Sequence, residues 1–217
     1  HQFPLGPAMS PRRRAALLDF ARAHGVSVVE DDYDSEFRYA GRPLDALQTL
    51  DRAECVFYVG TFSKSLFPAL RIGFVVPPPW ARRALLAAKQ LSDWHAPALV
   101  QDTLADFIAE GHLARHMRKI RRIYGERRLS LLAALARHCE GALEPIEGIA
   151  GLHLAARLRS PLRVSEVAAR AASVGIGLEL LDRYSVSSRV DALGFGYGLI
   201  RAEEIDEAVR RLAPCLG

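Results

Sequence analysis

Three short apolar segments constrain the fold of this chain more than any other feature. Residues 26–29, 55–59 and 72–76 are rich in valine and lack an alternation of apolar and polar positions. Such runs are typical of strands that are buried on both faces, as in a parallel sheet. A helix is predicted before the first of them, from the serine and proline at 10–11 to the glycine at 25. The sequence therefore predicts an α/β layer with a mostly parallel sheet.

The pattern changes after residue 80. Helical periodicity covers residues 80–92, 98–110 and 112–139, and a mixed pattern follows. In that last part we expect strands over residues 152–158, 176–181 and 193–199, and helices over 164–173 and 202–212. We therefore expect three parts, which are an α/β part over residues 1–110, a long linking helix over 111–140 and a small α+β domain over 141–217.

Composition excludes several classes of protein. Half of the 217 residues are hydrophobic and a quarter are charged, which predicts a packed core and excludes a disordered chain. No apolar run approaches the ~18 residues of a membrane span, and no signal peptide is recognisable. The three cysteines are far apart, fit no metal spacing and indicate a reducing cytoplasm, so we expect a cytoplasmic protein without a metal site. The first residue is not methionine, and we expect the chain to be a fragment or a processed product.

Reactive side chains follow two of the predicted strands. The first strand runs into DDYD (residues 31–34), and the second runs into GTFSKSLFPALR (residues 60–71). Ligands in open α/β sheets bind beyond the carboxyl ends of the strands. Only three of the 29 basic residues are lysines, and Lys64 is the one that lies in these stretches.

The two stretches together supply what pyridoxal phosphate (PLP) requires. The cofactor needs an amine for a Schiff base, an anion at the pyridinium nitrogen and a donor to the ring oxygen. Hydroxyl groups and a guanidinium hold its phosphate. Two other interpretations remain open from the residues alone. The carboxylates can form a solvated turn, and residues 60–65 can bind a nucleotide phosphate without Schiff-base chemistry, although no Walker or dinucleotide fingerprint is present.

Several sequence blocks closely resemble the aminotransferase-like domain of MocR/GabR-type regulators, a branch of the GntR-like bacterial transcription factors. The resemblance extends over essentially the whole chain and is most specific in the first of these blocks. The blocks are EDDYDSEFRY (30–39), GRPL (41–44), GTFSK (60–64), FPALRIG (67–73), HQFP (1–4), LADFIAEGH (104–112), Arg115-His116 and GFGYG (194–198). The resemblance implies the PLP-dependent transferase fold type I, with residues 1–110 as the C-terminal part of the large PLP-binding domain.

The resemblance also implies roles for individual residues. Lys64 would form the Schiff base with PLP, Asp31 would pair with the pyridine nitrogen, and Tyr33 would donate to the ring oxygen. The phosphate would be held by Thr61, Ser63 and Arg71. The arginine that holds a substrate carboxylate in transaminases has no secure counterpart here, and the candidates are Arg183 and Arg189.

The implied function is that of a PLP-binding, effector-sensing domain in a bacterial transcriptional regulator. An amino acid, an amine or PLP itself would be the effector, and a homodimer would form in the parent protein. DNA would bind only through an N-terminal winged-helix domain that this chain lacks, and no membrane is implied. The alternative is a PLP-dependent aminotransferase acting on an amino acid or amine, so enzymatic activity stays open.

The basic stretch over residues 115–128 allows two interpretations. It can bind nucleic-acid phosphates, or it can be the solvated face of the long linking helix, with Leu113, Met117, Ile120 and Tyr124 turned inward. We expect the second, because the stretch does not resemble a helix-turn-helix motif.

Overall fold

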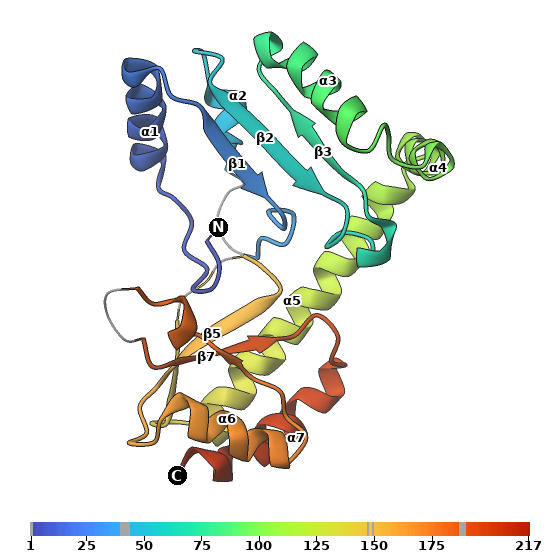
Figure 1. The fold of residues 1–217 in the computed structure, drawn as a ribbon. Helices are drawn as coiled ribbons and strands as arrows, with labels where there is room; N and C mark the ends of the chain where they lie inside the picture. Colours follow the sequence, from blue (N-terminus) through green and yellow to red (C-terminus); the bar gives the residue numbers. More distant parts are fainter. Residues whose placement is uncertain (1, 40–43, 147, 149, 187–189) are drawn as a thin grey trace. The chain divides into compact units, whose positions relative to one another are not determined.

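The computed structural model describes residues 2–39, 44–146, 148, 150–186 and 190–217. The chain divides into two compact units. One unit contains Met9–Glu36 and Arg42–Arg118, and the other contains His1–Ala8, Phe37–Gly41 and Lys119–Gly217. Figure 1 labels most of the helices and strands of both units.

The first unit is built on a three-stranded sheet of order β1-β2-β3. β1 (Val28–Asp32) runs parallel to β2 (Val56–Thr61), whereas β3 (Gly73–Val76) pairs antiparallel with β2. The sheet is therefore mixed rather than mostly parallel in its described pairings. The cause is the connection over residues 62–72, which has no helix long enough for a crossover and turns back beside β2.

One face of this sheet is covered by α1 (Pro11–His24) and α2 (Leu47–Leu50). The side chain of Ser10 accepts a hydrogen bond from the N–H of Arg13, and Gly25 ends α1 in the left-handed conformation at φ 61°. Both ends were predicted from these residue types. The core beneath the helices consists of Ala21, Leu47, Cys55 and Val56, with Leu17, Leu18 and Val28 packed against it.

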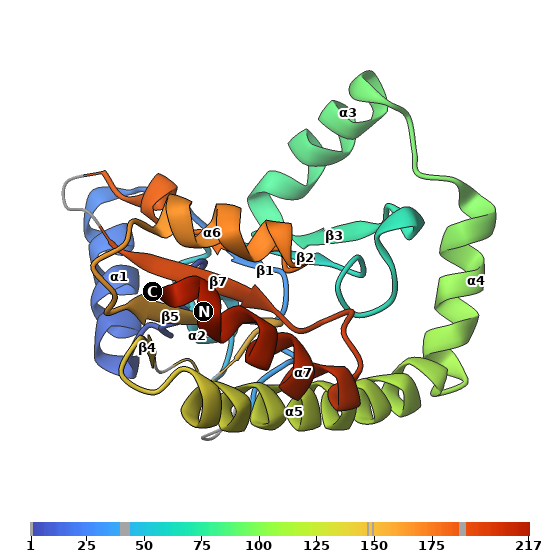
Figure 2. The ribbon, with the colours of Figure 1, turned by 90° about the horizontal axis from the view of Figure 1, so that it is seen from below.

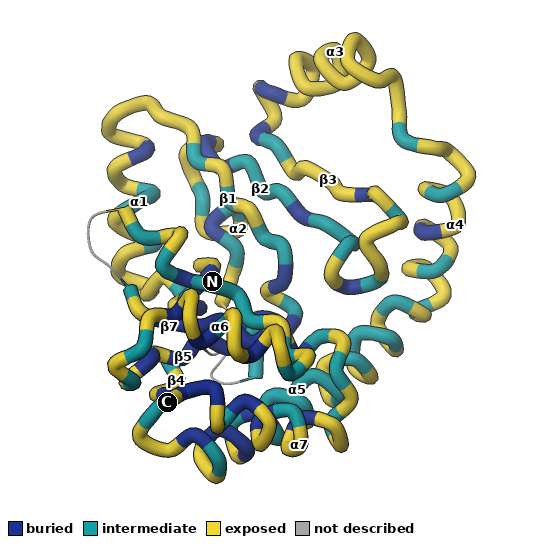
Figure 3. Tube along the Cα trace, turned by 60° about the horizontal axis from the view of Figure 1, so that its bottom comes forward, coloured by how far each residue is buried: buried dark blue, intermediate teal, exposed yellow. Residues whose placement is uncertain are grey.

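Three helices follow the sheet: α3 (Arg82–Ser92), α4 (Ala98–Ala109) and α5 (His112–His138). α3 buries no side chain, and large apolar groups are exposed along this region, among them Leu91 and Trp94 (Figure 3). α5 begins in the first unit and continues into the second. Among the described residues, no helix is both long and apolar enough to cross a membrane.

The second unit has a four-stranded antiparallel sheet of order β4-β5-β7-β6. Its strands are β4 (Leu143–Pro145), β5 (His153–Leu158), β6 (Glu179–Leu180) and β7 (Ala192–Gly196). Alternate residues of β5 pack into one core cluster with side chains of α5, α6 (Val164–Ser173) and α7 (Ala202–Leu212). Figure 2 shows these helices beside β5 and β7. Tyr197 is buried in this cluster, and its hydroxyl donates to the carbonyl of Gly151 over 2.5 Å.

Most predicted elements of this unit are present, and α6 and α7 have the expected bounds. The strand predicted over residues 176–181 is only two residues long. Its first part instead closes α6, because the N–H of Ile176 donates to the carbonyl of Ala171 and its side chain packs on the core. His153 is half-buried, and its Nε2 lies 2.9 Å from the carbonyl oxygen of Pro4.

Asp51 organises the turn that leads into β2. Its carboxylate accepts hydrogen bonds from the N–H groups of Ala53 (2.8 Å), Cys55 (2.7 Å) and Val56 (2.8 Å). Burial raises the pKa of Asp51, but these hydrogen bonds outweigh burial and lower the pKa below its usual 3.8.

We predict that Asp51→Ala lowers the free energy of unfolding by about 1–2 kcal/mol at pH 7, as the loss of a helix-capping side chain does. Because the folded pKa is depressed, the contribution of Asp51 is present above the unfolded pKa and is lost as pH falls through the folded value. Urea unfolding at pH 7 and pH 3 should therefore show a smaller difference between wild type and variant at pH 3. Asp19→Ala is the matched control, since Asp19 is 70% exposed, and a change of similar size in that variant would contradict the prediction.

Candidate functional site

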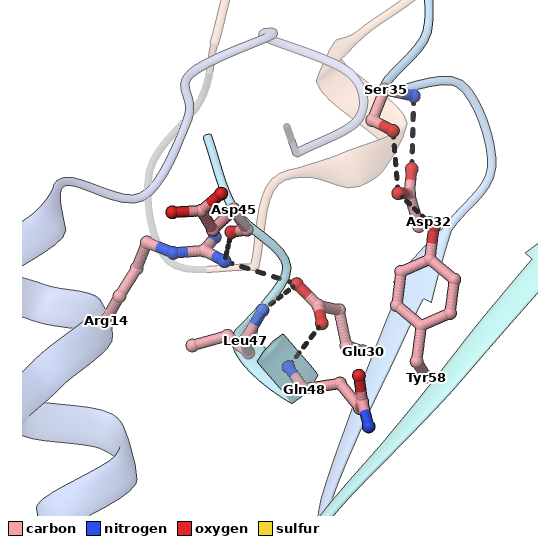
Figure 4. A network of polar contacts seen from close by, with 8 residues as sticks. All are labelled: Arg14, Glu30, Asp32, Ser35, Asp45, Leu47, Gln48 and Tyr58. Carbon is pink, nitrogen blue, oxygen red and sulfur yellow. Dashed lines mark hydrogen bonds and ion pairs between the residues drawn. The ribbon is translucent and has the colours of Figure 1, made fainter. Parts of the chain in front are cut away.

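The first acidic residue of β1 supports the fold. Glu30 accepts hydrogen bonds from the N–H groups of Leu47 (2.8 Å) and Gln48 (3.1 Å) at the start of α2. Arg14 of α1 lies 3.4 Å from the same carboxylate (Figure 4). Glu30 therefore ties both covering helices to the sheet, and its side chain is engaged on that face.

Asp32 lies on the same face, two residues further along β1. Its carboxylate accepts a 2.6 Å hydrogen bond from the hydroxyl of Tyr58 in β2, and it also accepts bonds from the N–H and the hydroxyl of Ser35 (Figure 4). The register aligns Glu30 with Tyr58, which places Tyr58 on this face as well. The carboxylate of Asp32 is therefore already engaged in hydrogen bonds with Tyr58 and Ser35.

Asp31 points to the opposite face, because successive side chains of a strand alternate between faces. It pairs in register with Val59, so Thr61, two residues after Val59, lies on the same face as Asp31. Asp31 is exposed, and within the described part of the chain its carboxylate makes no hydrogen bond or ion pair. Asp31 and Thr61 thus share one face at the carboxyl ends of two parallel strands, and Asp31 is open to a ligand.

Tyr33 follows directly after β1 and is half-buried. Burial, together with the negative charges of Asp34, Asp31 and Asp32, raises the pKa of Tyr33 to about 12. A phenol is protonated at neutral pH even at its ordinary pKa, and the raised pKa of Tyr33 extends this hydrogen-bond-donor form further into alkali.

The segment that carries Lys64 is held at several points. The N–H of Phe62 donates to the carbonyl of Ile72, and Nε2 of His116 in α5 lies 3.0 Å from the carbonyl oxygen of Ser65. The side chain of Ser65 is buried, whereas Lys64 beside it is exposed. The packing therefore fixes the backbone and leaves the amine accessible.

The hydroxyl of Thr61 accepts a hydrogen bond from the N–H of Ser63 over 3.1 Å. This contact uses a lone pair of Thr61 and leaves its proton for another acceptor. Arg71 ends the segment with an exposed side chain and a backbone in the left-handed region, at φ 52° and ψ 35°. A non-glycine residue in this region is uncommon, and such strain gathers at functional sites.

The two candidates for the arginine that binds a substrate carboxylate are Arg183 and Arg189. Arg183 belongs to the other unit, where its guanidinium lies 3.1 Å from Glu179 and its Nε donates to the carbonyl of Leu180. Arg183 is thus already paired with the two residues of β6, which precedes its 3-10 turn. Arg189 lies outside the described residues.

Three positioning residues were not found from the sequence. Tyr58 and Ser35 hold Asp32, and His116 holds the backbone beside Lys64. The two-residue period of β1 and β2 could have placed Tyr58 on the face of Asp32. His116 gave no such signal, because 51 residues separate it from Ser65. The described residues contain no group of three potential metal-binding side chains.

Residues 3–190 match the family described as aminotransferase class I and II. The chain belongs to this family. The resemblance to MocR-type regulators is also confirmed. The probable rhizopine catabolism regulatory protein MocR of Rhizobium meliloti is 43% identical over 84% of this chain and 37% of its own length. The pyridoxine biosynthesis regulator PdxR of Corynebacterium glutamicum is 32% identical over 91% of this chain and 43% of its own length.

Solved structures show the same fold. The kynurenine aminotransferase of Pyrococcus horikoshii, crystallised with PMP, superposes with a TM-score of 0.89 at 28% identity, over 99% of this chain and 54% of that one. LysN of Thermus thermophilus, an alpha-aminoadipate aminotransferase complexed with N-(5'-phosphopyridoxyl)-L-leucine, gives 0.86 at 29% identity, over 97% and 55%. The fold is therefore that of the PLP-dependent aminotransferases, fold type I. The chain spans about half, or less, of the length of these relatives.

We predict that Tyr33→Phe reduces the loss of stability in alkali. Between pH 10 and about 12 the unfolded phenol releases its proton while the folded one retains it, so wild-type stability falls with pH in this range. Urea unfolding at intervals from pH 7 to pH 11.5 should give parallel curves for the two proteins up to about pH 9 and a steeper wild-type decline above it. Parallel curves over the whole range would show that Tyr33 titrates normally.

Proposed function

We propose that this chain is the PLP-binding, effector-sensing part of a bacterial transcriptional regulator. The observation that carries the proposal is the separation of the two aspartates on β1. Asp32 is held by Tyr58 and Ser35, while Asp31 lies with Thr61 on the other face. A carboxylate that is open at the carboxyl end of a strand is what the pyridinium nitrogen of the cofactor needs.

The donor set of the first unit fits the cofactor. Asp31 would pair with the pyridinium nitrogen, and the protonated phenol of Tyr33 would donate to the ring oxygen. The exposed amine of Lys64 would attach covalently. Thr61, Ser63 and Arg71 would bind the phosphate through hydroxyl and guanidinium donors. When bound, PLP acts as an electron sink for the carbon that bears the amino group of a ligand.

The residues of the site that do not contact the cofactor would hold the contacting residues in position. The contact of His116 with the carbonyl of Ser65 holds the backbone next to Lys64, which would limit the positions that the amine can reach. An amino ligand that replaces Lys64 on the cofactor would free this side chain and its positive charge. We propose that the freed charge shifts a conformational equilibrium of the parent protein, so that binding of an amino acid or amine changes DNA binding elsewhere.

A second candidate function is that of an aminotransferase. It is supported by the aromatic-amino-acid aminotransferase 1 of Thermococcus litoralis, which is 29% identical over 98% of this chain and 51% of its own length. In that case Lys64 would carry a proton to and from the ligand carbon. The ion pair of Arg183 with Glu179 favours the sensor only weakly, because both side chains are exposed and a substrate carboxylate could replace Glu179.

The first test concerns Lys64 in the full-length protein. We predict that Lys64→Ala abolishes covalent attachment of PLP, as seen by borohydride reduction and peptide mass mapping, and abolishes effector-dependent change in a promoter-reporter assay. Lys89→Ala is the matched control, because Lys89 is exposed and pairs with Asp93 on α3. Intact regulation in Lys64→Ala would refute the sensor, and steady turnover of an amino donor by wild type without any regulation would favour the aminotransferase.

The second test compares the neighbouring aspartates. Asp31→Asn removes a charge-assisted hydrogen bond to the cofactor and should weaken PLP binding by about 10-fold or more. Asp32→Asn should change affinity by less than about 3-fold but lower the free energy of unfolding, because Tyr58 and Ser35 lose a charged acceptor. Equilibrium titration by PLP absorbance and urea unfolding measure the two effects. The opposite order of affinities would assign the role to Asp32.

A further inference from the structure

A basic pocket lies in the second unit. It has a volume of about 290 Å³ and is formed by one face of α5 together with Arg38 and Tyr39, which follow β1 in the sequence. Its lining consists of Arg38, Tyr39, Arg121, Gly125, Arg128 and Leu129. None of the residues that we assign to PLP belongs to this unit.

Helix periodicity builds one wall of the pocket. Positions 121, 125, 128 and 129 recur at the spacing that places side chains on one side of a helix. Gly125 has no side chain to fill the space between the arginines. A Cβ built there would lie 3.7 and 3.9 Å from ring carbons of Tyr39, which is ordinary contact. Glycine therefore keeps the floor open in the middle of a long helix, where it is otherwise unfavourable.

Arg38 supplies the unusual group of this pocket. Its Nε is buried and has no hydrogen-bond partner in the described structure. The backbone of Arg38 is fixed by a bridge to Ala150, so the side chain starts from a defined position. A buried N–H of a charged group without an acceptor is costly, and the residue that carries it lines the pocket.

Two contacts orient the guanidinium group of Arg128. Its guanidinium carbon lies 5.8 Å from the ring centroid of Tyr39, and one of its terminal nitrogens donates to the carbonyl of Gly148 over 2.5 Å. These contacts hold the guanidinium plane and leave its other N–H groups for a ligand.

The charged groups of the described lining have one sign. Three of its six described residues are arginines, and none of the six carries a carboxylate. Arg122, also on α5, is not among the lining residues; it is 67% exposed and pairs with Glu126 over 2.6 Å. We propose that the pocket binds the phosphate group of a small molecule, whose oxygens and double negative charge match several converging guanidinium groups.

The test uses full-length protein that has been loaded with PLP and dialysed, so that the proposed cofactor site is filled. Inorganic phosphate in a chloride buffer is titrated by calorimetry, and the midpoint of thermal unfolding is followed in parallel. We expect one phosphate per chain and a rising midpoint. Arg38→Met should weaken binding by about 10-fold or more, while Arg122→Gln, with the same loss of charge, should change it by less than about 2-fold.

A second variant keeps every arginine. Gly125→Leu fills the floor of the pocket with a better helix former, so we expect phosphate binding to disappear while the midpoint without phosphate stays the same or rises. No phosphate binding by wild type would overturn the proposal. Equal losses of phosphate affinity in Arg38→Met and Arg122→Gln, or full binding by Gly125→Leu, would also overturn the proposal. Either result would show that phosphate binds to a diffuse basic surface and not in the pocket. A 20-base-pair duplex that binds equally to wild type and Gly125→Leu, when phosphate does not bind, would point to nucleic acid instead.

Discussion

The parallel pairing of β1 with β2 is the constraint on which the candidate site depends. In this pairing, residues in register share a face and neighbours along a strand do not. The acidic run of β1 is therefore divided. Glu30 and Asp32 face the side covered by α1 and α2 and are occupied there by backbone N–H groups and hydroxyls, whereas Asp31 faces the other side with Thr61. The three adjacent residues thus have different surroundings, although each carries a carboxylate.

The segment between β2 and β3 shows how a reactive side chain can be exposed on a rigid backbone. Its ends are joined by a hydrogen bond from Phe62 to Ile72, and its middle is held through Ser65 and His116. Side chains that bind or react need this combination, because a mobile amine loses orientation and a buried one loses access. Tyr33 complements it with a phenol that remains a donor at neutral pH.

Features encoded locally were predictable from the sequence. The capping serine and glycine gave both ends of α1, and periodicity gave α6 and α7. Features that depend on distant contacts were not. The direction of β3 follows from its pairing with β2, β4 exists only by pairing with β5, and α2 is a single turn held by Glu30. For the site, the resemblance supplied Asp31, Tyr33 and Lys64. The strand period could have placed Tyr58 on the face of Asp32, but its hydrogen bond to Asp32 and the contact of His116 with Ser65 depend on tertiary packing.

The left-handed backbone conformation of Arg71 affects which residues are expected at this position during evolution. Glycine or asparagine would relieve the conformational strain there, but neither carries a guanidinium. If Arg71 binds the phosphate as we propose, local folding and anion binding favour different residues at this position. In related sequences that do not bind the anion, glycine or asparagine would then be expected here, whereas an arginine would be expected where binding is kept. The residue at position 71 of a related protein would thus indicate whether that protein binds an anion at this end of the sheet.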